Sequence, residues 1–212
     1  MKHIEKKVVE PAIFEKWHKQ GGWDACDPNN PKSFNPKALE LKQEIRNLLL
    51  CEQGDICCYC EERIKANCCH IEHLNPKGRP EFATLKSSYS NLLCSCNHGL
   101  SCGKAKENAE IGITPLMEDC EEHFTYTDDG KIEGKNQKAI DTIGVLKINS
   151  ERLNAARHGV ISVLLHSDGS GITLSEYDSW IQDYLTLDAE GRYKRYWSAI
   201  KFIANKYRDC YE

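Results

Sequence analysis

Cysteine is concentrated in about a quarter of this 212-residue chain. Nine of its twelve cysteines lie between Cys51 and Cys102, at positions 51, 57, 58, 60, 68, 69, 94, 96 and 102. The first seventeen residues carry Lys or Glu every few positions and lack the apolar core of a signal peptide, so we expect a cytoplasmic protein. Thiols stay reduced in that compartment. Clustered reduced thiols are typical of a metal site, which constrains how the centre of the chain can fold.

A Cys-x-x-Cys turn at Cys57 and Cys60 opens the cluster. Such a turn directs two thiolates at one zinc ion, with each sulfur about 2.3 Å from the metal. A closed tetrahedral site needs a second pair of ligands. We predict Cys96 and Cys102 as that pair, with Cys94 as a nearby competitor. Four other cysteines are expected to be small buried hydrophobes: Cys26, Cys51, Cys120 and Cys210.

Charge is unevenly distributed along the chain, although the net charge is only −4. Residues 57–106 hold seven basic and four acidic residues, whereas residues 107–134 hold one basic and nine acidic residues. The positive segment can face phosphates. The acidic segment is typical of a solvated surface, or of a surface that meets a basic partner. No apolar run approaches the roughly 20 residues that a bilayer requires, so we expect no membrane partner.

Hydrophobic periodicity predicts helices on both sides of the cysteine-rich centre. The predicted helices cover 11–20, 36–53, 149–166 with Asn149 as its cap, 173–187 and 192–211. Residues 124–133 form a predicted hairpin that turns at Asp128-Asp129-Gly130, and residues 167–171 are predicted to break the helical region. We therefore divide the chain into an N-terminal helical segment (1–54), a metal-bearing motif (55–110) and a hairpin with a helical C-terminal region (111–212).

Between the two cysteine pairs lies His70-Ile71-Glu72-His73, followed by a turn at Asn75-Pro76. An extended segment that ends in Glu-His presents a carboxylate beside an imidazole. A carboxylate can hold a hard cation that neutralises charge developing on a phosphate. An imidazole with a pKa near neutrality can take a proton from water. Together, within a zinc-stapled segment, these groups favour phosphodiester hydrolysis.

The short segments HIEH, SYSNLL, CSCN and CGKAK together resemble the motif of the zinc-bearing branch of the HNH endonucleases. The resemblance implies an α+β, mostly α, chain whose centre is a zinc-stapled ββα-metal motif, with N-terminal helices and a C-terminal helical extension. It implies His73 as the general base and Glu72 as a metal ligand. It also implies that Asn91 fixes the loop and orients the histidine.

The last catalytic ligand departs from the family pattern. Gly103 stands where many members carry Asn or His directly after the final zinc cysteine. We predict Asn97 in that role, with His98 as the second choice, around Mg²⁺ or Mn²⁺. His70 lies deeper in its strand and is expected either to support the metal ligands from behind or to be structural. Four basic residues are predicted to hold flanking phosphates or to be solvated: Lys77, Arg79, Lys104 and Lys106.

Resemblance extends beyond the motif to residues 111–134 and 140–165 and to the word CCYCEERI. These are similar to the HNH nuclease subunits of Septu anti-phage systems (PtuB) and of certain retrons. The resemblance implies a toxic effector that acts on DNA or RNA beside an ABC-type ATPase (PtuA-like), or with a retron reverse transcriptase and its RNA. Residues 135–212 carry 11 basic and 10 acidic residues, a balance that suits packing against such a protein.

Two other functions fit parts of the pattern. A zinc-stapled module that binds nucleic acid or protein without catalysis is favoured by Gly103. A redox or thiol-reactive protein would instead use Cys57 and Cys60 as its reactive pair.

Overall fold

The computed structural model describes residues 1–165 and 173–210. Its strands are β1 (Cys69–His73), β2 (Leu92–Cys96), β3 (Phe124–Tyr126) and β4 (Ile132–Gly134). Its α-helices are α1 (Ala12–Lys19), α2 (Pro36–Glu52), α3 (Gly103–Lys106), α4 (Gln137–Leu146), α5 (Glu151–Leu165), α6 (Leu174–Leu185) and α7 (Trp197–Tyr207). Short 3-10 turns cover Gly22–Cys26, Pro80–Leu85, Tyr89–Asn91, Cys120–His123 and Arg208–Cys210. None of the described helices is long and apolar enough to cross a membrane.

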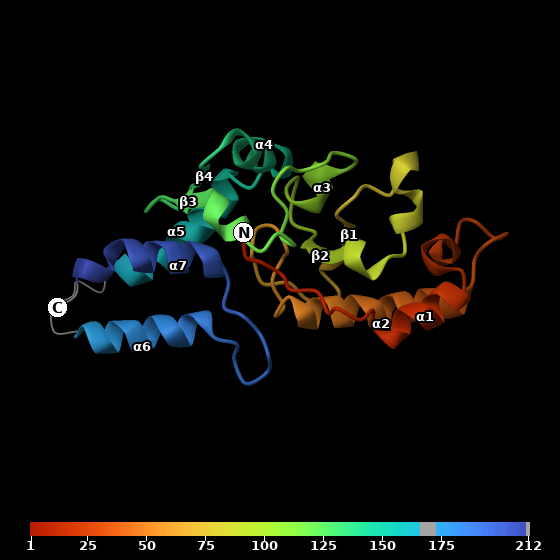
Figure 1. Cartoon of the computed structure of the whole chain (residues 1–212), viewed down its shortest axis with the longest axis horizontal. Coiled ribbons are helices and arrows are strands. Elements are labelled where there is room, and N and C mark those ends of the chain that lie inside the picture. Colours follow the sequence, from red (N-terminus) through yellow and green to blue (C-terminus); the bar gives the residue numbers. More distant parts are fainter. Residues whose placement is uncertain (166–172, 211–212) are drawn as a thin grey trace.

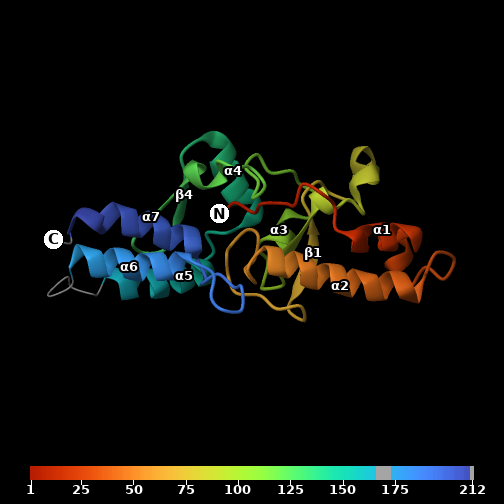
Figure 2. The same cartoon turned by 60° about the horizontal axis from the view of Figure 1, so that its bottom comes forward.

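The strands β1 and β2 and the short helix α3 lie at the centre of the molecule (Figure 1). Helices α1 and α2 extend from one side of this centre, and α5, α6 and α7 extend from the other. Helix α2 packs against β2 of this strand pair, and the turned view shows it extending outward from the centre of the molecule (Figure 2). The predicted fold class, a mostly helical α+β chain with a cysteine-stapled ββα motif at its centre, is confirmed.

The strands β1 and β2 form an antiparallel pair in which His70 lies opposite Ser95 and Glu72 opposite Leu93. Gln53, at the end of α2, holds this pair against the helix. Its buried side chain donates to the carbonyls of Ile56 and Cys94 and accepts from the Cys94 amide at 2.6 Å. Because every hydrogen-bonding atom of a buried amide is thus paired, the position of α2 relative to β2 is well defined.

Helix α2 begins as its sequence predicts. Asn35 is its N-cap, with a side chain that accepts from the Lys37 amide at 3.0 Å, and Pro36 is the first helical residue. The apolar positions Leu41, Ile45 and Leu49 are buried. Phe14 and Trp17 of α1 are also fully buried in this part of the core.

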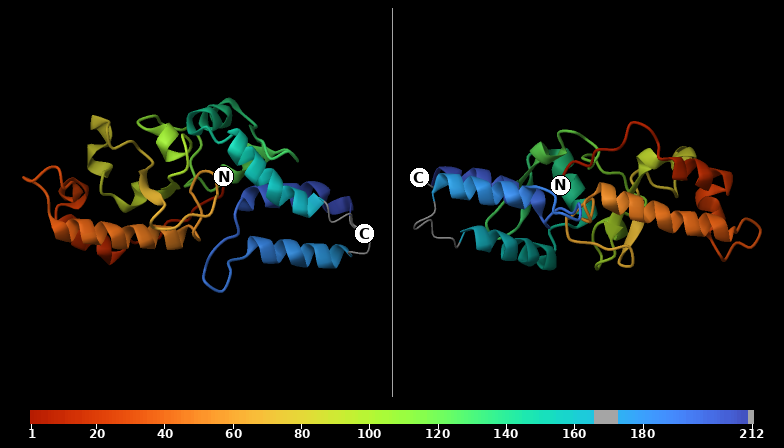
Figure 3. Two further views of the ribbon diagram at one scale, coloured as in Figure 1. Left: turned by 180° about the vertical axis from the view of Figure 1, so that it is seen from behind. Right: turned by 90° about the horizontal axis from the view of Figure 1, so that it is seen from below.

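In the C-terminal region, α7 packs against both α5 and α6 (Figure 3). The hairpin is present as β3 and β4, whereas α4 is a helix that we did not predict. The cap assigned to Asn149 is wrong: its side chain pairs with the backbone of Ile132 at 2.8 and 2.9 Å, and α5 begins at Glu151. The predicted break at 167–171 and the predicted helix ends at His166 and Tyr211 lie outside the described residues. Cys26 and Cys120 are buried as expected, but Cys51 and Cys210 are exposed.

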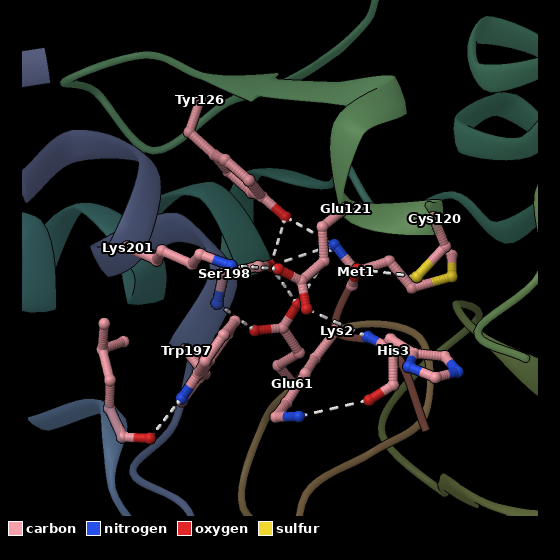
Figure 4. A network of polar contacts seen from close by, with 11 residues as sticks. Met1, Lys2, His3, Glu61, Cys120, Glu121, Tyr126, Trp197, Ser198 and Lys201 are labelled. Atoms are coloured by element: carbon pink, nitrogen blue, oxygen red, sulfur yellow. Dashed lines mark hydrogen bonds and ion pairs between the residues drawn. The ribbon is translucent and has the colours of Figure 1, made fainter. Parts of the chain in front are cut away.

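A buried polar network joins the centre to α7 (Figure 4). The Glu61 carboxylate accepts from the Ser198 amide at 2.7 Å and from the Ser198 hydroxyl. It also pairs with the Met1 amino group at 3.1 Å. The Ser198 hydroxyl is 2.7 Å from the hydroxyl of Tyr126. Glu61 follows the zinc-knuckle cysteine Cys60 directly, so this network ties the metal-bearing motif to the helical region.

Ser198→Ala is expected to destabilise the protein by about 1–3 kcal/mol, because it leaves buried partners of the hydroxyl unpaired. The measurement is the free energy of unfolding in urea. Ser175→Ala, at an exposed position of α6, is the control and should stay within about 0.5 kcal/mol of the parent. Equal stability of the two variants would contradict this role for the network.

Candidate metal centre and active site

Four cysteine sulfurs converge between the knuckle, the end of β2 and the start of α3. The Sγ atoms of Cys57, Cys60, Cys96 and Cys102 all lie within 4.8 Å of one another. Cys60 and Cys96 are 3.9 Å apart, close to the ~3.8 Å edge of a tetrahedron with zinc–sulfur bonds of about 2.3 Å. All four side chains are at most 4% exposed. This donor set and spacing could hold a structural zinc ion. Cys94 is outside the cluster, with its thiol 3.6 Å from the Arg46 carbonyl.

The pKa values of the four thiols are shifted in different directions. Burial disfavours ionisation of Cys57, but hydrogen bonds from Cys102 and the other neighbouring thiols hold its pKa well below the usual value. The Cys57 sulfur in turn raises the pKa of Cys102 well above the usual range. The Cys96 amide donates to the Cys57 sulfur at 3.3 Å. A thiolate held by backbone amides and neighbouring thiols is the form of cysteine that binds a metal ion.

Helix α3 is fixed against the strand pair at its first residue. The Gly103 amide donates to the Ser95 hydroxyl at 3.0 Å, and the Cys102 amide donates to the Leu146 carbonyl at 2.8 Å. Ser95 lies opposite His70 in the sheet. These bonds bring Gly103 against the face of β1 that carries His70 and Glu72, because alternate residues of a strand share a face.

A line of polar contacts crosses this face. Asn97 Oδ1 is 2.8 Å from His70 Nδ1, and His70 Nε2 is 3.1 Å from Glu72 Oε2. The other carboxylate oxygen, Glu72 Oε1, accepts from Tyr59 at 3.1 Å and pairs with Lys106 at 3.2 Å. Burial raises the Glu72 pKa, but the His70 hydrogen bond and the Lys106 charge outweigh it, so that the pKa is lowered overall. Burial likewise lowers the His70 pKa, while its bonds to Glu72 and Asn97 raise it, and the raising effects are larger.

His73, the last residue of β1, has a different environment. Its Nε2 lies 3.0 Å from the Lys86 carbonyl and therefore donates to it, which leaves Nδ1 with a free lone pair. Its ring meets the Trp23 ring edge-on, with centroids 4.3 Å apart. Burial lowers the His73 pKa to about 4. The imidazole is thus neutral at physiological pH, the state that can accept a proton.

Asn91 fixes the loop that follows β1. Its side chain accepts from the Asn75 amide at 2.7 Å and donates to the carbonyls of Asn75 and Leu85 at 3.1 and 3.2 Å. The residue is 2% exposed. The same loop carries the Lys86 carbonyl that orients His73. Asn91 therefore positions the histidine through the backbone and does not contact its ring in any hydrogen bond.

The four basic residues predicted to meet phosphates are in different environments. Lys77 and Lys104 are exposed; Lys77 lies over the Trp23 ring, and Lys104 donates to the Asn97 carbonyl. Arg79 is paired with Glu81 and Glu110. Lys106, expected at the surface, is instead buried, with its ammonium bound to Glu72 and to the His73 carbonyl. Because its ammonium group is buried and already bound, Lys106 is not available to contact the phosphates of a nucleic acid, and the prediction for this residue is wrong.

Gly103 has a direct structural role beside the carboxylate. A Cβ at this position would lie 2.3 Å from Glu72 Oε2 and 2.5 Å from His70 Nε2. With glycine there, no side chain separates α3 from these two atoms. The oxygen and the nitrogen are donors that suit a divalent cation, so the residues fit a catalytic metal. Asn97 contacts Nδ1 of His70, whereas Glu72 contacts Nε2, and His98 is exposed on the following loop.

Sequence reasoning missed two neighbours of the site, Tyr59 and Trp23, and placed His70 in a supporting or structural role. Alternation along β1 already put His70 and Glu72 on one face and was the available signal for His70. No signal in the sequence linked Trp23 to His73, because the two residues are fifty positions apart.

Comparison with known proteins identifies the family to which the chain belongs. No family model matches the chain. A protein of Vibrio cholerae serotype O1 biovar El Tor, named "Retron Vc95 putative HNH endonuclease", is 31% identical over 138 residues. The aligned region covers 59% of this chain and 67% of the relative. The relative's name assigns it to the HNH endonucleases, and this chain has a strand pair followed by a short helix, four converging cysteines and Glu-His at the end of the first strand. The chain belongs to the HNH endonuclease family, a family of nucleases.

Cys57→Ser is expected to lower bound zinc well below one ion per chain and to lower the melting temperature, because a structural metal contributes its binding free energy to folding. Zinc is measured by elemental analysis of protein purified without added metal. Cys51→Ser is the matched control at an exposed cysteine and should leave both quantities unchanged. Full zinc content in Cys57→Ser would rule out this ligand.

Gly103→Ala is expected to reduce nuclease activity by about 100-fold, because its methyl group would displace Glu72 and His70, and small misplacements of this kind cost about that much. The clash is with the ends of buried, hydrogen-bonded side chains, so the melting temperature should also fall, and activity is compared at a temperature where both proteins are folded. Gly144→Ala is the control, since a Cβ there meets nothing within 4 Å. Activity equal to the parent would show that the glycine is not needed for the site.

Proposed function

We propose that this chain is a metal-dependent HNH endonuclease that hydrolyses phosphodiester bonds, with His73 as the general base. The observation that carries the proposal is the environment of His73. Its Nε2–H is held by the Lys86 carbonyl, so the neutral ring keeps one lone pair, on Nδ1, for a proton from water. Burial lowers the pKa of His73 to about 4, below the near-neutral value expected from the sequence, so the ring is neutral at pH 7 but a weaker base than a free imidazole.

Glu72 and His70 are the proposed first ligands of the divalent cation, Mg²⁺ or Mn²⁺. Glu72 Oε1 is occupied by Tyr59 and Lys106, which leaves Oε2 directed toward His70 and Gly103. Asn97 accepts from His70 Nδ1–H, so that a cation at Nε2 would replace the hydrogen bond that this nitrogen makes with Glu72 Oε2. Metal-binding histidines are generally oriented in this way by a partner on the other ring nitrogen. Asn97 thereby becomes a positioning residue, and His98 remains the alternative ligand.

When bound, the cation supplies charge stabilisation for the phosphate and for the departing oxygen. The chain's own residues do the rest. His73 takes the proton of the attacking water at Nδ1. Asn91 holds the loop that orients His73. Lys77 and Lys104 are exposed and offer ammonium groups to flanking phosphates, and the exposed parts of Arg79 offer a third cation.

The biological setting is proposed from the relative and from the sequence. The relative's name links it to a retron. We propose that this chain is likewise an effector of anti-phage defence, toxic when released or activated, and that its DNA or RNA substrate reaches it in a complex. The partner proteins are an ABC-type ATPase of the PtuA kind, or a retron reverse transcriptase with its RNA. Toxicity that requires both His73 and the neighbouring genes would support this setting.

The alternative is a zinc-stapled binding subunit without catalysis. Gly103, which removes the usual last ligand, is the observation in its favour. Calorimetric titration with Mn²⁺ separates the two functions before any substrate is added. Binding that depends on Glu72 supports the nuclease, and absence of any Glu72-dependent binding supports the inactive subunit.

His73→Ala is expected to reduce cleavage of plasmid DNA or RNA by about 10²–10⁴-fold, the usual contribution of a general base. Zinc content should not change, since His73 is not among the four cysteine ligands. His70→Ala should also lose activity, but with weaker Mn²⁺ binding, whereas His73→Ala should bind Mn²⁺ normally. The measurements are initial rates and calorimetric Mn²⁺ affinities at matched zinc occupancy.

Lys135→Ala, at an exposed position between β4 and α4, is the control and should leave activity and Mn²⁺ affinity unchanged. An active His73→Ala would overturn the assignment of the base. An active His70→Ala with unchanged Mn²⁺ affinity would return the second ligand position to Asn97 or His98.

A further inference from the structure

A groove between α5 and α6 is not used by the nuclease site. It has a volume of about 440 Å³, and its lining includes Gly159 and Val163 of α5 and Trp180 and Tyr184 of α6. Arg63 and Arg195 complete one part of its wall. Helices α5 and α6 each pack on α7 (Figure 3). The residues that line the groove come from both α5 and α6. None of its lining residues belongs to the candidate catalytic site.

The groove exposes apolar side chains that a folded chain normally covers. Val163 is 64% exposed and Trp180 is 40% exposed, and they face the same hollow from two different helices. Single exposed apolar residues are ordinary on a protein surface. Apolar residues gathered around a hollow with a polar rim are typical of a binding site.

Gly159 provides space for an inserted side chain. It is exposed within α5, and a Cβ built on it would meet nothing within 4 Å. Glycine in the interior of a helix costs about 1 kcal/mol relative to alanine, and no close approach within the described chain requires it here. The wall of the groove is therefore open at this point, next to Val163.

The charged side of the groove is basic. Neither Arg63 nor Arg195 has a carboxylate within ion-pair distance among residues 1–165 and 173–210, whereas Lys194 is paired with Asp183. Arg63 is held by the carbonyls of Gly54 and Tyr193, so its position is set by the chain itself. Two guanidinium groups beside an apolar hollow suit carboxylates that accompany an apolar side chain.

We propose that this groove docks an acidic amphipathic segment of a partner protein. One bulky apolar side chain of the partner inserts over Gly159, between Val163 and Trp180, and its carboxylates pair with Arg63 and Arg195. The inference goes beyond the proposed nuclease activity and does not depend on it. It defines the chemistry of a protein that this chain binds through its helical region.

A nucleic acid fits the groove less well. The rings of Trp180 and Tyr184 are tilted by 48° with centroids 6.0 Å apart, so they pack on each other and do not form parallel platforms for successive bases. The Tyr184 hydroxyl is tied to the Arg195 carbonyl at 2.7 Å. The near balance of 11 basic and 10 acidic residues over 135–212 is also poor for a phosphate track.

The test selects random peptides of about four helical turns on the full chain and counter-selects them on Gly159→Leu. Gly159→Leu fills the open wall at an exposed helical position, so melting should not fall. Gly144→Leu is the matched control, because Gly144 is also exposed, helical and without neighbours within 4 Å of a Cβ. Arg195→Glu tests the charge, since Arg195 is exposed. Affinities of the selected peptides are measured by fluorescence anisotropy.

Selected peptides are expected to carry a spaced apolar face flanked by Asp or Glu. They should bind the parent and Gly144→Leu equally, and bind Gly159→Leu and Arg195→Glu about tenfold or more weakly. Failure to obtain such peptides, or peptides without acidic residues, would overturn the proposal. Oligothymidylate binding that both Gly159→Leu and Arg195→Glu weaken would assign the groove to nucleic acid instead. A dimer in light scattering that Gly159→Leu converts to monomer would assign it to a second copy of the chain.

Discussion

Convergence of four buried sulfurs is the constraint on which the rest of the centre depends. The cluster joins the knuckle after α2, the last residue of β2 and the residue before α3. Cys102 has φ 58° and ψ −134°, a backbone conformation that costs a non-glycine residue about 1–3 kcal/mol and persists only where its surroundings fix it. Held there, Cys102 starts α3 with Gly103 against the strand face that carries His70 and Glu72. The candidate structural metal site and the proposed catalytic site are thus parts of one local fold.

The two oxygens of the buried Glu72 carboxylate have different partners, one set in the surrounding fold and the other in the proposed catalytic site. Its Oε1 is bound by Tyr59, which lies between the knuckle cysteines Cys57 and Cys60, and by Lys106 at the end of α3. Its Oε2 faces His70 and Gly103. An unpaired buried carboxylate would be protonated, because desolvation disfavours its charge. The hydrogen bond from His70 and the charge of Lys106 outweigh desolvation and lower the pKa of Glu72, so that the ionised form, the form that a metal ligand requires, is favoured.

The knuckle also connects the catalytic centre to the helical region. Glu61 binds the start of α7 through Ser198, and Arg63 contributes to the groove between α5 and α6. Both residues lie within three positions of Cys60. A partner docked in that groove would therefore contact a segment whose conformation the metal site fixes.

The sequence by itself determined the local features: helix α2 with its Asn-Pro start, the Asp-Asp-Gly hairpin, and the spacing that pairs Cys57-x-x-Cys60 with Cys96 and Cys102. Each depends on neighbours in the chain or on the fixed reach of a turn. Only the tertiary structure decided that Lys106 is buried against Glu72, that Asn149 pairs with Ile132 and does not cap α5, and that His70 lies between Asn97 and Glu72. These outcomes depend on which distant segments meet, and the desolvation that results decides whether a lysine is a surface cation or a buried partner.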